Sequence, residues 1–182
     1  MYKLQCTMYN KRVKVLFICT GNICRSPMAE IIFANLCKKN GRTDIIVKSA
    51  GTHAHEGEIM APYTNVALDK CGEKVPSEPV RVTQWRDEMF YEYDHVVCMT
   101  GWHESVILAR AAMQKTKRRI KAKIYTLDSV AGCGDIADPW CYPLPIYIEV
   151  CKVLQNALGM LYDEISGGNN AGHHNRKRPP RV

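Results

Sequence analysis

The segment that most constrains the fold of this chain is the run of residues 15–27, which reads VLFICTGNICRSP. Residues 13–18 form a short apolar run, typical of a strand buried on both faces of a sheet. Small residues follow, and then Ser26 and Pro27 predict a helix start, with an N-cap hydroxyl and a proline at the first helical position. A strand, a tight loop and a helix N-terminus in this order can form a cradle for an oxyanion, because the loop N–H groups can point at one anion.

A cysteine and an arginine stand in this segment with the spacing C-x5-R, at Cys19 and Arg25. Gly21 tolerates the backbone angles of a tight curl, and the planar guanidinium of Arg25 can bind two phosphate oxygens. The helix dipole, the loop amides and Arg25 together favour the thiolate of Cys19. We therefore predict that Cys19 is a nucleophile facing a bound phosphoryl group. The spacing alone also occurs by chance, but the surrounding strand, loop and helix signals favour the oxyanion site.

Apolar strand patterns alternate with helical patterns along the rest of the chain. The expected strands are residues 13–18, 45–47, 95–99 and 122–127. The expected helices begin at Pro27, Pro62 and Thr100, and the last one carries an apolar stripe at Ile146, Val150, Val153, Leu154, Ala157, Leu158, Leu161 and Ile165. This alternation predicts an α/β fold, a single-domain doubly wound sheet of about four parallel strands with helices on both faces. Ligands bind beyond the carboxyl ends of such strands, so the loop of residues 128–142 is expected near Cys19.

These motifs resemble those of the low-molecular-weight protein tyrosine phosphatase family. The likeness includes residues 19–27 (CTGNICRSP), 49–52 (SAGT), 93–99 (YDHVVCM) and 138–140 (DPW), and extends from about residue 12 to about residue 165. It implies the same doubly wound fold. It also implies hydrolysis of protein phosphotyrosine and small aryl phosphates through a phosphocysteine intermediate, without a cofactor.

Asp138 is the candidate general acid. Transfer of a phosphoryl group to Cys19 expels an oxyanion that needs a proton, and the phosphocysteine then needs an activated water; one carboxyl group can serve both steps. Asp-Pro alone is typical of a turn, but the match to the family's Asp-Pro-aromatic pattern favours Asp138. Asp135 is the nearest rival. Trp140 is expected to form a wall of the cleft, where an aryl phosphate can stack on it.

The other loop residues are expected to complete the phosphate-binding loop: Thr20, Gly21, Asn22, Ile23, Cys24 and Ser26. Besides capping the helix, Ser26 is implied by the family resemblance to support the thiolate, and Asn22 is expected to brace the loop through its side chain. His55 stands where the family often has a large apolar residue, so we assign it to the cleft wall. A bystander role for His53 and His55 is the alternative.

Three other functions are alternatives, and the sequence disfavours each of them. The related arginine phosphatases share almost the whole signature but usually carry threonine at the position of Ile23, and an apolar Ile23 favours a flat aryl group over a guanidinium. Thioredoxin-coupled arsenate reductases need two further cysteines after the third strand, whereas Cys98 lies inside that strand and the next cysteine is Cys133. An inactive phosphate-binding module is disfavoured by the complete set of candidate catalytic residues.

Length and composition predict one domain with two extensions. The 182 residues suit a single phosphatase domain over residues 12–166, with an N-terminal extension at 1–11 and a basic tail at 167–182 that is expected to be disordered. No apolar run is long enough to span a bilayer, and residues 1–11 lack a signal-peptide core. The nine cysteines are odd in number and irregularly spaced, which predicts reduced thiols in the cytoplasm and no metal site.

The net charge of +7 comes largely from the tail and from a basic run over residues 115–123. An anionic partner such as a nucleic acid is one interpretation of this run. A solvated helix end is the other, and we favour it because no aromatic residues are interspersed. The expected partners are phosphotyrosine-containing proteins, with neither nucleic acid nor membrane, and the sequence does not indicate an oligomeric state.

Overall fold

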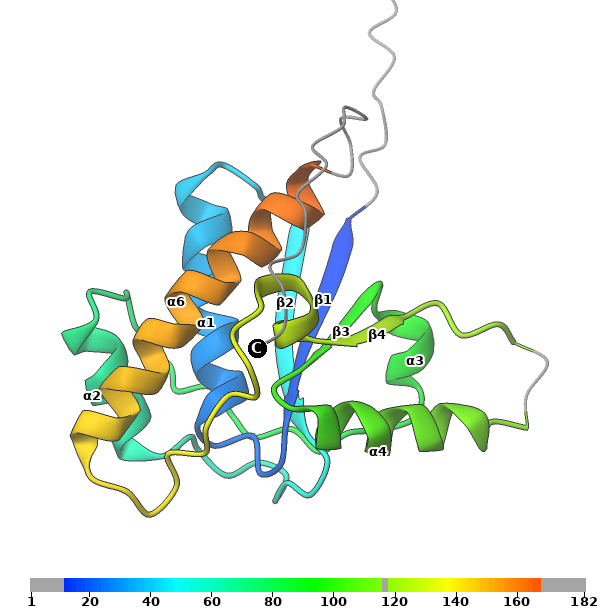
Figure 1. The fold of residues 1–182 in the computed structure, drawn as a ribbon, viewed down its shortest axis with the longest axis horizontal. Coiled ribbons are helices and arrows are strands. Elements are labelled where there is room, and N and C mark those ends of the chain that lie inside the picture. Colours follow the sequence, from blue (N-terminus) through cyan, green and yellow to red (C-terminus); the bar gives the residue numbers. More distant parts are fainter. Residues whose placement is uncertain (1–11, 116–117, 168–182) are drawn as a thin grey trace, which may run out of the picture.

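The computed structural model describes residues 12–115 and 118–167 of the chain. In this part, four strands form one parallel sheet with the order β2-β1-β3-β4 (Figure 1). The strands are β1 (Val13–Cys19), β2 (Ile45–Gly51), β3 (His95–Cys98) and β4 (Lys123–Thr126). The predictions for residues 1–11 and 168–182 fall outside the described residues, as do residues 116–117 of the basic run.

Strand β1 is the centre of the fold, because its side chains are buried on both faces of the sheet. Phe17 packs into one apolar core, and Leu16 and Ile18 pack into a second core on the opposite face. The strand pairs with β2 on one side and β3 on the other. The chain therefore winds first one way and then the other from β1, so that a crevice opens at the carboxyl ends of β1 and β3.

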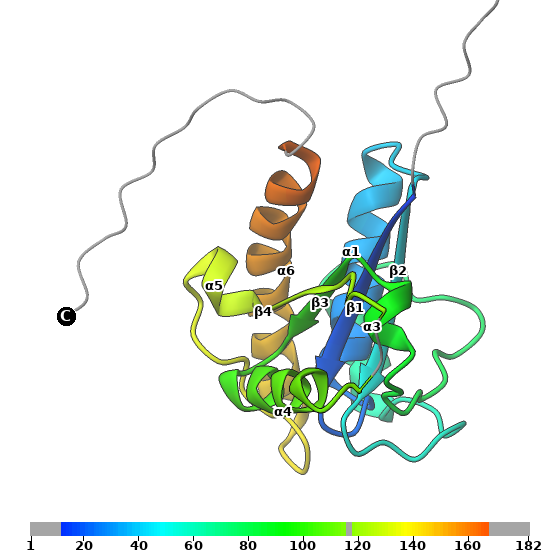
Figure 2. The ribbon, with the colours of Figure 1, turned by 90° about the vertical axis from the view of Figure 1, so that its right-hand side faces the viewer.

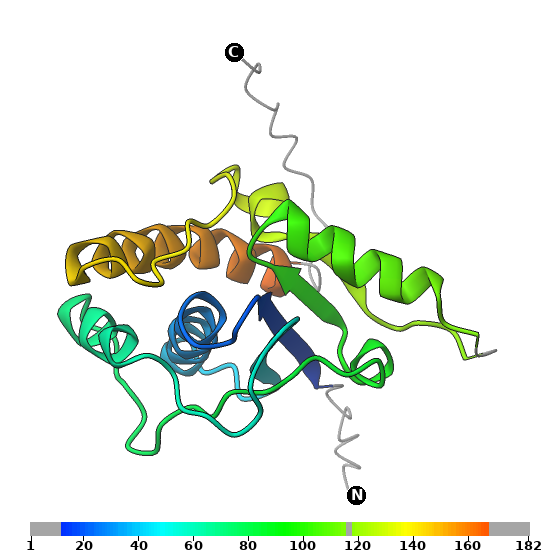
Figure 3. The same ribbon diagram turned by 90° about the horizontal axis from the view of Figure 1, so that it is seen from below.

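Helices cover both faces of the sheet, as predicted (Figure 2 and Figure 3). One face carries α1 (Arg25–Lys39), α2 (Pro62–Lys70), α5 (Leu127–Ala131) and α6 (Leu144–Gly167). The other face carries α3 (Met89–Glu92) and α4 (Gly101–Ala112). Within the described ranges, none of these helices combines the length and the apolar character that a membrane span requires.

Two of the predicted helix starts are confirmed. Pro62 is the first residue of α2. Thr100 is the N-cap of α4, and its hydroxyl accepts the backbone N–H of His103. Gly167, which the sequence places at the start of the tail, is instead the last residue of α6.

The sequence pattern misses short helices and misplaces part of the last one. Neither α3, with four residues, nor α5, with five, is predicted, because a single turn has no apolar period to detect. In α6 the predicted stripe includes Val153, which is 41% exposed. Tyr147 and Cys151 are buried instead. The 3.6-residue period places these two side chains, and not Val153, on the face toward the core.

Candidate active site

The loop between β1 and α1 curls around the sulfur of Cys19. Cys19 ends β1 and is buried. Its Sγ accepts the backbone N–H of Asn22 at 3.3 Å and lies 3.0 Å from the hydroxyl oxygen of Ser26. Asn22 has a φ of 54°, a left-handed conformation that asparagine tolerates better than most residues. This turn brings the amide of the loop and the first turn of α1 to one sulfur atom.

Ser26 is not the N-cap of α1, and that prediction is wrong. The helix begins two residues before the predicted start at Pro27, at Arg25, and Cys24 is the N-cap without a side-chain cap bond. Ser26 therefore lies in the first turn, and its Oγ accepts a hydrogen bond from Asn22 Nδ2 at 2.8 Å. Because Oγ accepts from Asn22, its own proton can go to the sulfur of Cys19 at 3.0 Å or to the carbonyl oxygen of Ala50 at 3.4 Å, and the sulfur is the nearer acceptor.

The buried side chain of Asn22 is hydrogen bonded on three sides. Its Nδ2 donates to Ser26 Oγ and, at 2.9 Å, to Ser49 Oγ. Its Oδ1 accepts the backbone N–H of Thr83 at 2.8 Å. Ser49 Oγ in turn donates to Glu30 Oε2 at 2.6 Å, and burial raises the pKa of the Glu30 carboxyl. The loop is thus tied to β2 and to the segment before α3 through one amide.

The carbonyl oxygens of the loop are turned away from the sulfur. The carbonyl oxygens of Cys19 and Thr20 accept backbone N–H groups from the two residues that follow β2. The carbonyl oxygen of Ile23 accepts hydrogen bonds from the start of α2. The donors are Thr52 N, His53 N, Ala61 N and Thr64 Oγ1, at 2.9 to 3.0 Å. An anion beside Cys19 would therefore not face these three carbonyl dipoles.

Gly51 lets β2 approach the loop closely. A Cβ at this position would lie 2.4 Å from the carbonyl oxygen of Thr20 and 2.9 Å from the amide nitrogen of Asn22. Real Cβ atoms do not approach backbone atoms so closely. The glycine of the SAGT segment is thus required by the packing of two backbones.

Arg25 and Asp138 form an ion pair at the cavity. Arg25 Nη2 lies 2.6 Å from Asp138 Oδ2, and the side chains are 7% and 50% exposed. Arg25 Nη1 donates to the carbonyl oxygen of Ile136 at 3.4 Å. Arg25 Nε is buried and has no acceptor among the described residues, so the guanidinium keeps an unused donor. The sheet thus brings the loop after α5 to Cys19, as the topology predicts.

A cavity of about 200 Å³ opens above the sulfur of Cys19. It is lined by Cys19, Thr20, Gly21, Ile23, Cys24, Arg25, Asp138 and Trp140. Asn22 and Ser26 lie behind this lining. His55 is exposed and does not line the cavity, so its place in the cleft wall stays a prediction. Asp135 is engaged elsewhere, because its Oδ1 accepts the backbone N–H of Gly101 at the start of α4.

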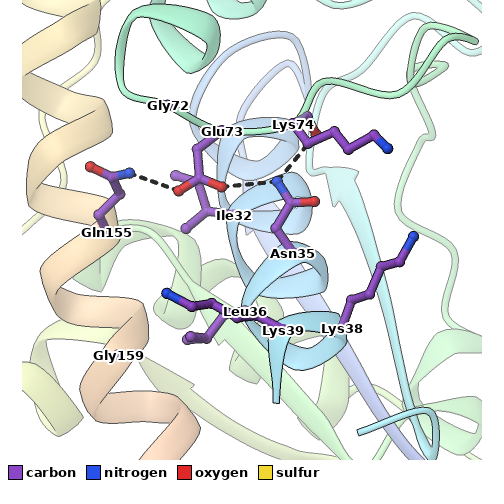
Figure 4. A pocket seen from close by; sticks show the side chains of 10 residues that line it. All are labelled: Ile32, Asn35, Leu36, Lys38, Lys39, Gly72, Glu73, Lys74, Gln155 and Gly159. Atoms are coloured by element: carbon purple, nitrogen blue, oxygen red, sulfur yellow. Dashed lines mark hydrogen bonds between the residues drawn. The ribbon is translucent and has the colours of Figure 1, made fainter. Parts of the chain in front are cut away.

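Two of the further cavities outside this site lie beside α6. One, of about 320 Å³, shares Trp140 with the site and is otherwise lined by the start of α2, the segment before α6 and α6 itself. Its aromatic side chains are Tyr63, Tyr142 and Tyr147. The other, of about 510 Å³, lies between α1 and α6 (Figure 4). Its carboxylate, Glu73, is hydrogen bonded by Gln155 and Asn35. None of the predicted site residues lines this larger cavity.

His103 is a site residue that no sequence motif indicates. It is buried on α4, and its Nε2 lies 3.0 Å from the hydroxyl oxygen of Thr20. Burial and then the nearby charge of Arg25 lower the pKa of His103 to about 4. The only local signal is the predicted helix start at Thr100, three residues earlier, after the strand that pairs with β1.

Cys24 lies in the same lining as Cys19 but in a different chemical environment. It is buried, and its Sγ lies 3.5 Å from Tyr147 Oη. Burial raises the pKa of the Cys24 thiol to about 11, so this cysteine is protonated at neutral pH.

Within the described ranges, no three His, Cys, Asp or Glu side chains gather closely enough to hold a metal ion.

Comparisons with known proteins agree on one family. The model of the low molecular weight phosphotyrosine protein phosphatase family matches residues 14–170. A protein-arginine-phosphatase of Geobacillus stearothermophilus is 32% identical over 84% of this chain and 95% of its own length. A low molecular weight protein-tyrosine-phosphatase of Bacillus subtilis is 29% identical over 84% and 96%. The crystal structure of a low molecular weight protein tyrosine phosphatase from T. tengcongensis has a TM-score of 0.71 at 31% identity, covering 84% of this chain and 99% of that one.

Proposed function

This chain belongs to the low molecular weight phosphotyrosine protein phosphatase family, and on that premise we propose that it hydrolyses phosphotyrosine in proteins through a phosphocysteine intermediate. The observation that carries the proposal is the cavity itself. A buried cysteine forms its floor, and an arginine paired with a carboxylate stands at its side. These are a nucleophile, an anion-binding group and a proton donor for one phosphoryl group.

In the first step, the thiolate of Cys19 attacks the phosphorus atom of the substrate. An S–P bond forms as the bond between phosphorus and the tyrosine oxygen breaks, and Asp138 delivers its proton to that oxygen. Arg25 binds the equatorial phosphoryl oxygens and spreads their developing charge. The hydroxyl of Ser26, 3.0 Å from the sulfur, donates to the thiolate before the attack.

In the second step, water hydrolyses the phosphocysteine. Asp138, now ionised, takes a proton from the water, whose oxygen attacks phosphorus. The S–P bond breaks, inorganic phosphate leaves and the thiolate of Cys19 is restored. The same carboxyl group serves both steps because each needs it in the form left by the other. Its 50% exposure gives it access to water.

The lining of the cavity supports an aryl phosphate as substrate. Ile23 and Trp140 both line it, and neither offers an acceptor to a guanidinium group. The ring of phosphotyrosine can stack on Trp140, which is 53% exposed. Phosphoarginine in proteins is the second candidate, because a relative of similar length is named a protein-arginine-phosphatase.

A matched set of phosphopeptides tests the assignment. Peptides that differ only in carrying phosphotyrosine, phosphoserine or phosphoarginine are compared by kcat/KM. We expect phosphotyrosine to be the best substrate, and Ile23→Thr to shift the ratio toward phosphoarginine. A wild-type preference for phosphoarginine would replace the first candidate with the second. Cys19→Ser should abolish turnover of all three while still binding phosphate, because a hydroxyl is a poor nucleophile without an adjacent base.

We further propose that the enzyme works in the reducing environment of the cytoplasm. All eight cysteines of the described residues are free thiols, and five of them are buried beside apolar side chains. Free thiols at this density are typical of intracellular proteins. Mass spectrometry of the protein from its native source, with and without reduction, tests this state.

A further inference from the structure

A chain of three hydrogen-bonded side chains connects α4 to the phosphate loop. Its central member is His103, which is only 2% exposed. His103 Nδ1 lies 2.6 Å from Thr100 Oγ1, and His103 Nε2 lies 3.0 Å from Thr20 Oγ1. Thr20 follows Cys19 directly and lines the cavity. The chain therefore runs from the N-cap of α4 to a hydroxyl beside the nucleophile.

The imidazole ring of His103 is neutral. Burial and the charge of Arg25 hold the pKa of His103 at about 4, well below its ordinary value. A neutral imidazole has one N–H donor and one acceptor nitrogen. Which group donates in each of the two hydrogen bonds of His103 thus depends on which ring nitrogen carries the proton.

The N-cap of α4 sets the direction of these two hydrogen bonds. Thr100 Oγ1 already accepts the backbone N–H of His103 at 3.3 Å, so its own proton is available to donate to Nδ1. Nδ1 is then the acceptor, and Nε2–H donates to Thr20 Oγ1. In the reverse direction, Thr100 Oγ1 would accept two hydrogen bonds and its proton would find no acceptor among the described residues.

The hydroxyl of Thr20 is then occupied as an acceptor on two sides. It accepts Nε2–H of His103, and it also accepts Arg25 Nη2–H at 3.4 Å. Its proton must point away from both donors. We propose that His103 is a positioning residue that turns the hydroxyl proton of Thr20 into the cavity, where it donates to a phosphoryl oxygen of the substrate. This inference rests on the proposed function, because it needs a phosphoryl group in the cavity.

A hydroxyl donor in this position adds a hydrogen bond that the backbone does not supply. A bond from a neutral hydroxyl to a phosphoryl dianion is charge-assisted and stronger than a neutral one. A protonated His103 would place a second cation beside Arg25. The neutral ring adds no charge and only fixes the orientation of the Thr20 hydroxyl proton. A residue that merely fills space would need neither ring nitrogen.

The first test removes the hydroxyl of Thr20. The inhibition constant of inorganic phosphate and kcat/KM for an aryl phosphate are measured for Thr20→Val and Thr20→Ser. Loss of one hydrogen bond to a charged group is expected to weaken phosphate inhibition roughly 10- to 100-fold in Thr20→Val. Thr20→Ser, which keeps the hydroxyl, should recover most of that affinity. Equal inhibition of wild type and Thr20→Val would overturn the proposal, whatever the effect of changes at His103.

The second test separates direction from packing at His103. The amide of Gln can replace the donor at Nε2, whereas the shorter Asn reaches only the position of Nδ1. His103→Asn should weaken phosphate inhibition about as much as Thr20→Val, and His103→Gln should recover most of the loss. In the Thr20→Val background, His103→Asn should have no further effect. An equal loss in both backgrounds would mean that His103 only supports the fold.

The two proposals fail in different ways. If wild type turns over no phosphorylated residue or aryl phosphate, the proposed function fails. If wild type is active, Cys19→Ser is inactive and Thr20→Val binds phosphate as wild type does, the function stands and the inference about His103 fails.

Discussion

Arg25 Nη2 and Asp138 Oδ2 lie 2.6 Å apart, so the arginine proposed to bind phosphate is paired with the carboxylate proposed to protonate the leaving group. A guanidinium has five N–H donors, and Arg25 can therefore hold Asp138 and a phosphoryl oxygen together. The pair holds the carboxyl group of Asp138 at the cavity, where it can reach the leaving-group oxygen once it is protonated. Asp135 has no such position, because its carboxylate accepts the backbone N–H of Gly101.

The role of Asp138 predicts a dependence on the leaving group. Asp138→Asn should slow hydrolysis of phosphotyrosine by roughly 10²- to 10⁴-fold, the usual contribution of a general acid. The loss should shrink for aryl phosphates with acidic leaving groups, which need no proton. Measuring kcat for a series of substituted phenyl phosphates checks this. An equal loss across the series would assign the proton to another group, with Asp135→Asn as the next variant.

The position of Cys24 predicts reversible oxidation. Peroxide converts the Cys19 thiolate to a sulfenic acid, and the Cys24 thiolate then attacks that sulfur and releases hydroxide, which leaves a disulfide. Because the pKa of Cys24 is about 11, disulfide formation should accelerate as the pH rises above neutral. Cys24→Ser should keep most of the initial activity but recover much less after peroxide and dithiothreitol. Equal recovery would make Cys24 a structural residue.

The close approach of β2 to the loop predicts a severe effect of one methyl group. Gly51→Ala would force the carbonyl oxygen of Thr20 or the amide of Asn22 to move. We expect a loss of about 1–3 kcal/mol in the free energy of unfolding and a larger relative loss of phosphate binding. Gly159→Ala is the matched control, because nothing lies within 4 Å of its Cβ and the helix gains up to about 1 kcal/mol. Urea unfolding and phosphate inhibition are measured for both.

The buried His103 predicts a loss of stability in mild acid. Its pKa is about 4 in the folded chain and near 6.5 in an unfolded one, so the unfolded chain binds the proton more tightly. The free energy of unfolding should therefore be independent of the His103 titration above about pH 6.5. It should fall by about 3 kcal/mol as the pH drops from there toward 4. His103→Gln should flatten this dependence in urea titrations at each pH. The other groups acting on this ring are Arg25, Asp138, Asp135 and His53. If the change of the free energy of unfolding with pH is the same in His103→Gln, the pH dependence belongs to those other groups.

The sequence predicts those features that depend on local chemistry. The strand before Cys19, the helix start at Pro62 and the cap at Thr100 each follow from a few neighbouring residues. Ser26 shows where local rules fail. Serine before proline is a common N-cap. Here the loop curls around the sulfur of Cys19, so the helix begins at Arg25 and the hydroxyl of Ser26 lies against that sulfur.

His103 shows a different limit. Its sequence distance from Thr20 is 83 residues, and only the pairing of β1 with β3 brings the two side chains together. No periodicity in either segment records that contact. A buried hydrogen-bond chain of this kind is visible only once the strand order is known.

The outward hydrogen bonds of the phosphate loop have a consequence for the order in which the protein folds. The loop is only a few residues long, yet its partners Ser49, Thr64 and Thr83 lie 27 to 61 residues from the loop positions they bind. Contacts between distant segments form late because closing long stretches of chain costs entropy. During refolding from urea, helical circular dichroism should therefore return before phosphatase activity. The catalytic centre, although its cysteine and arginine come from one short motif, is completed only when the tertiary structure around that motif has formed.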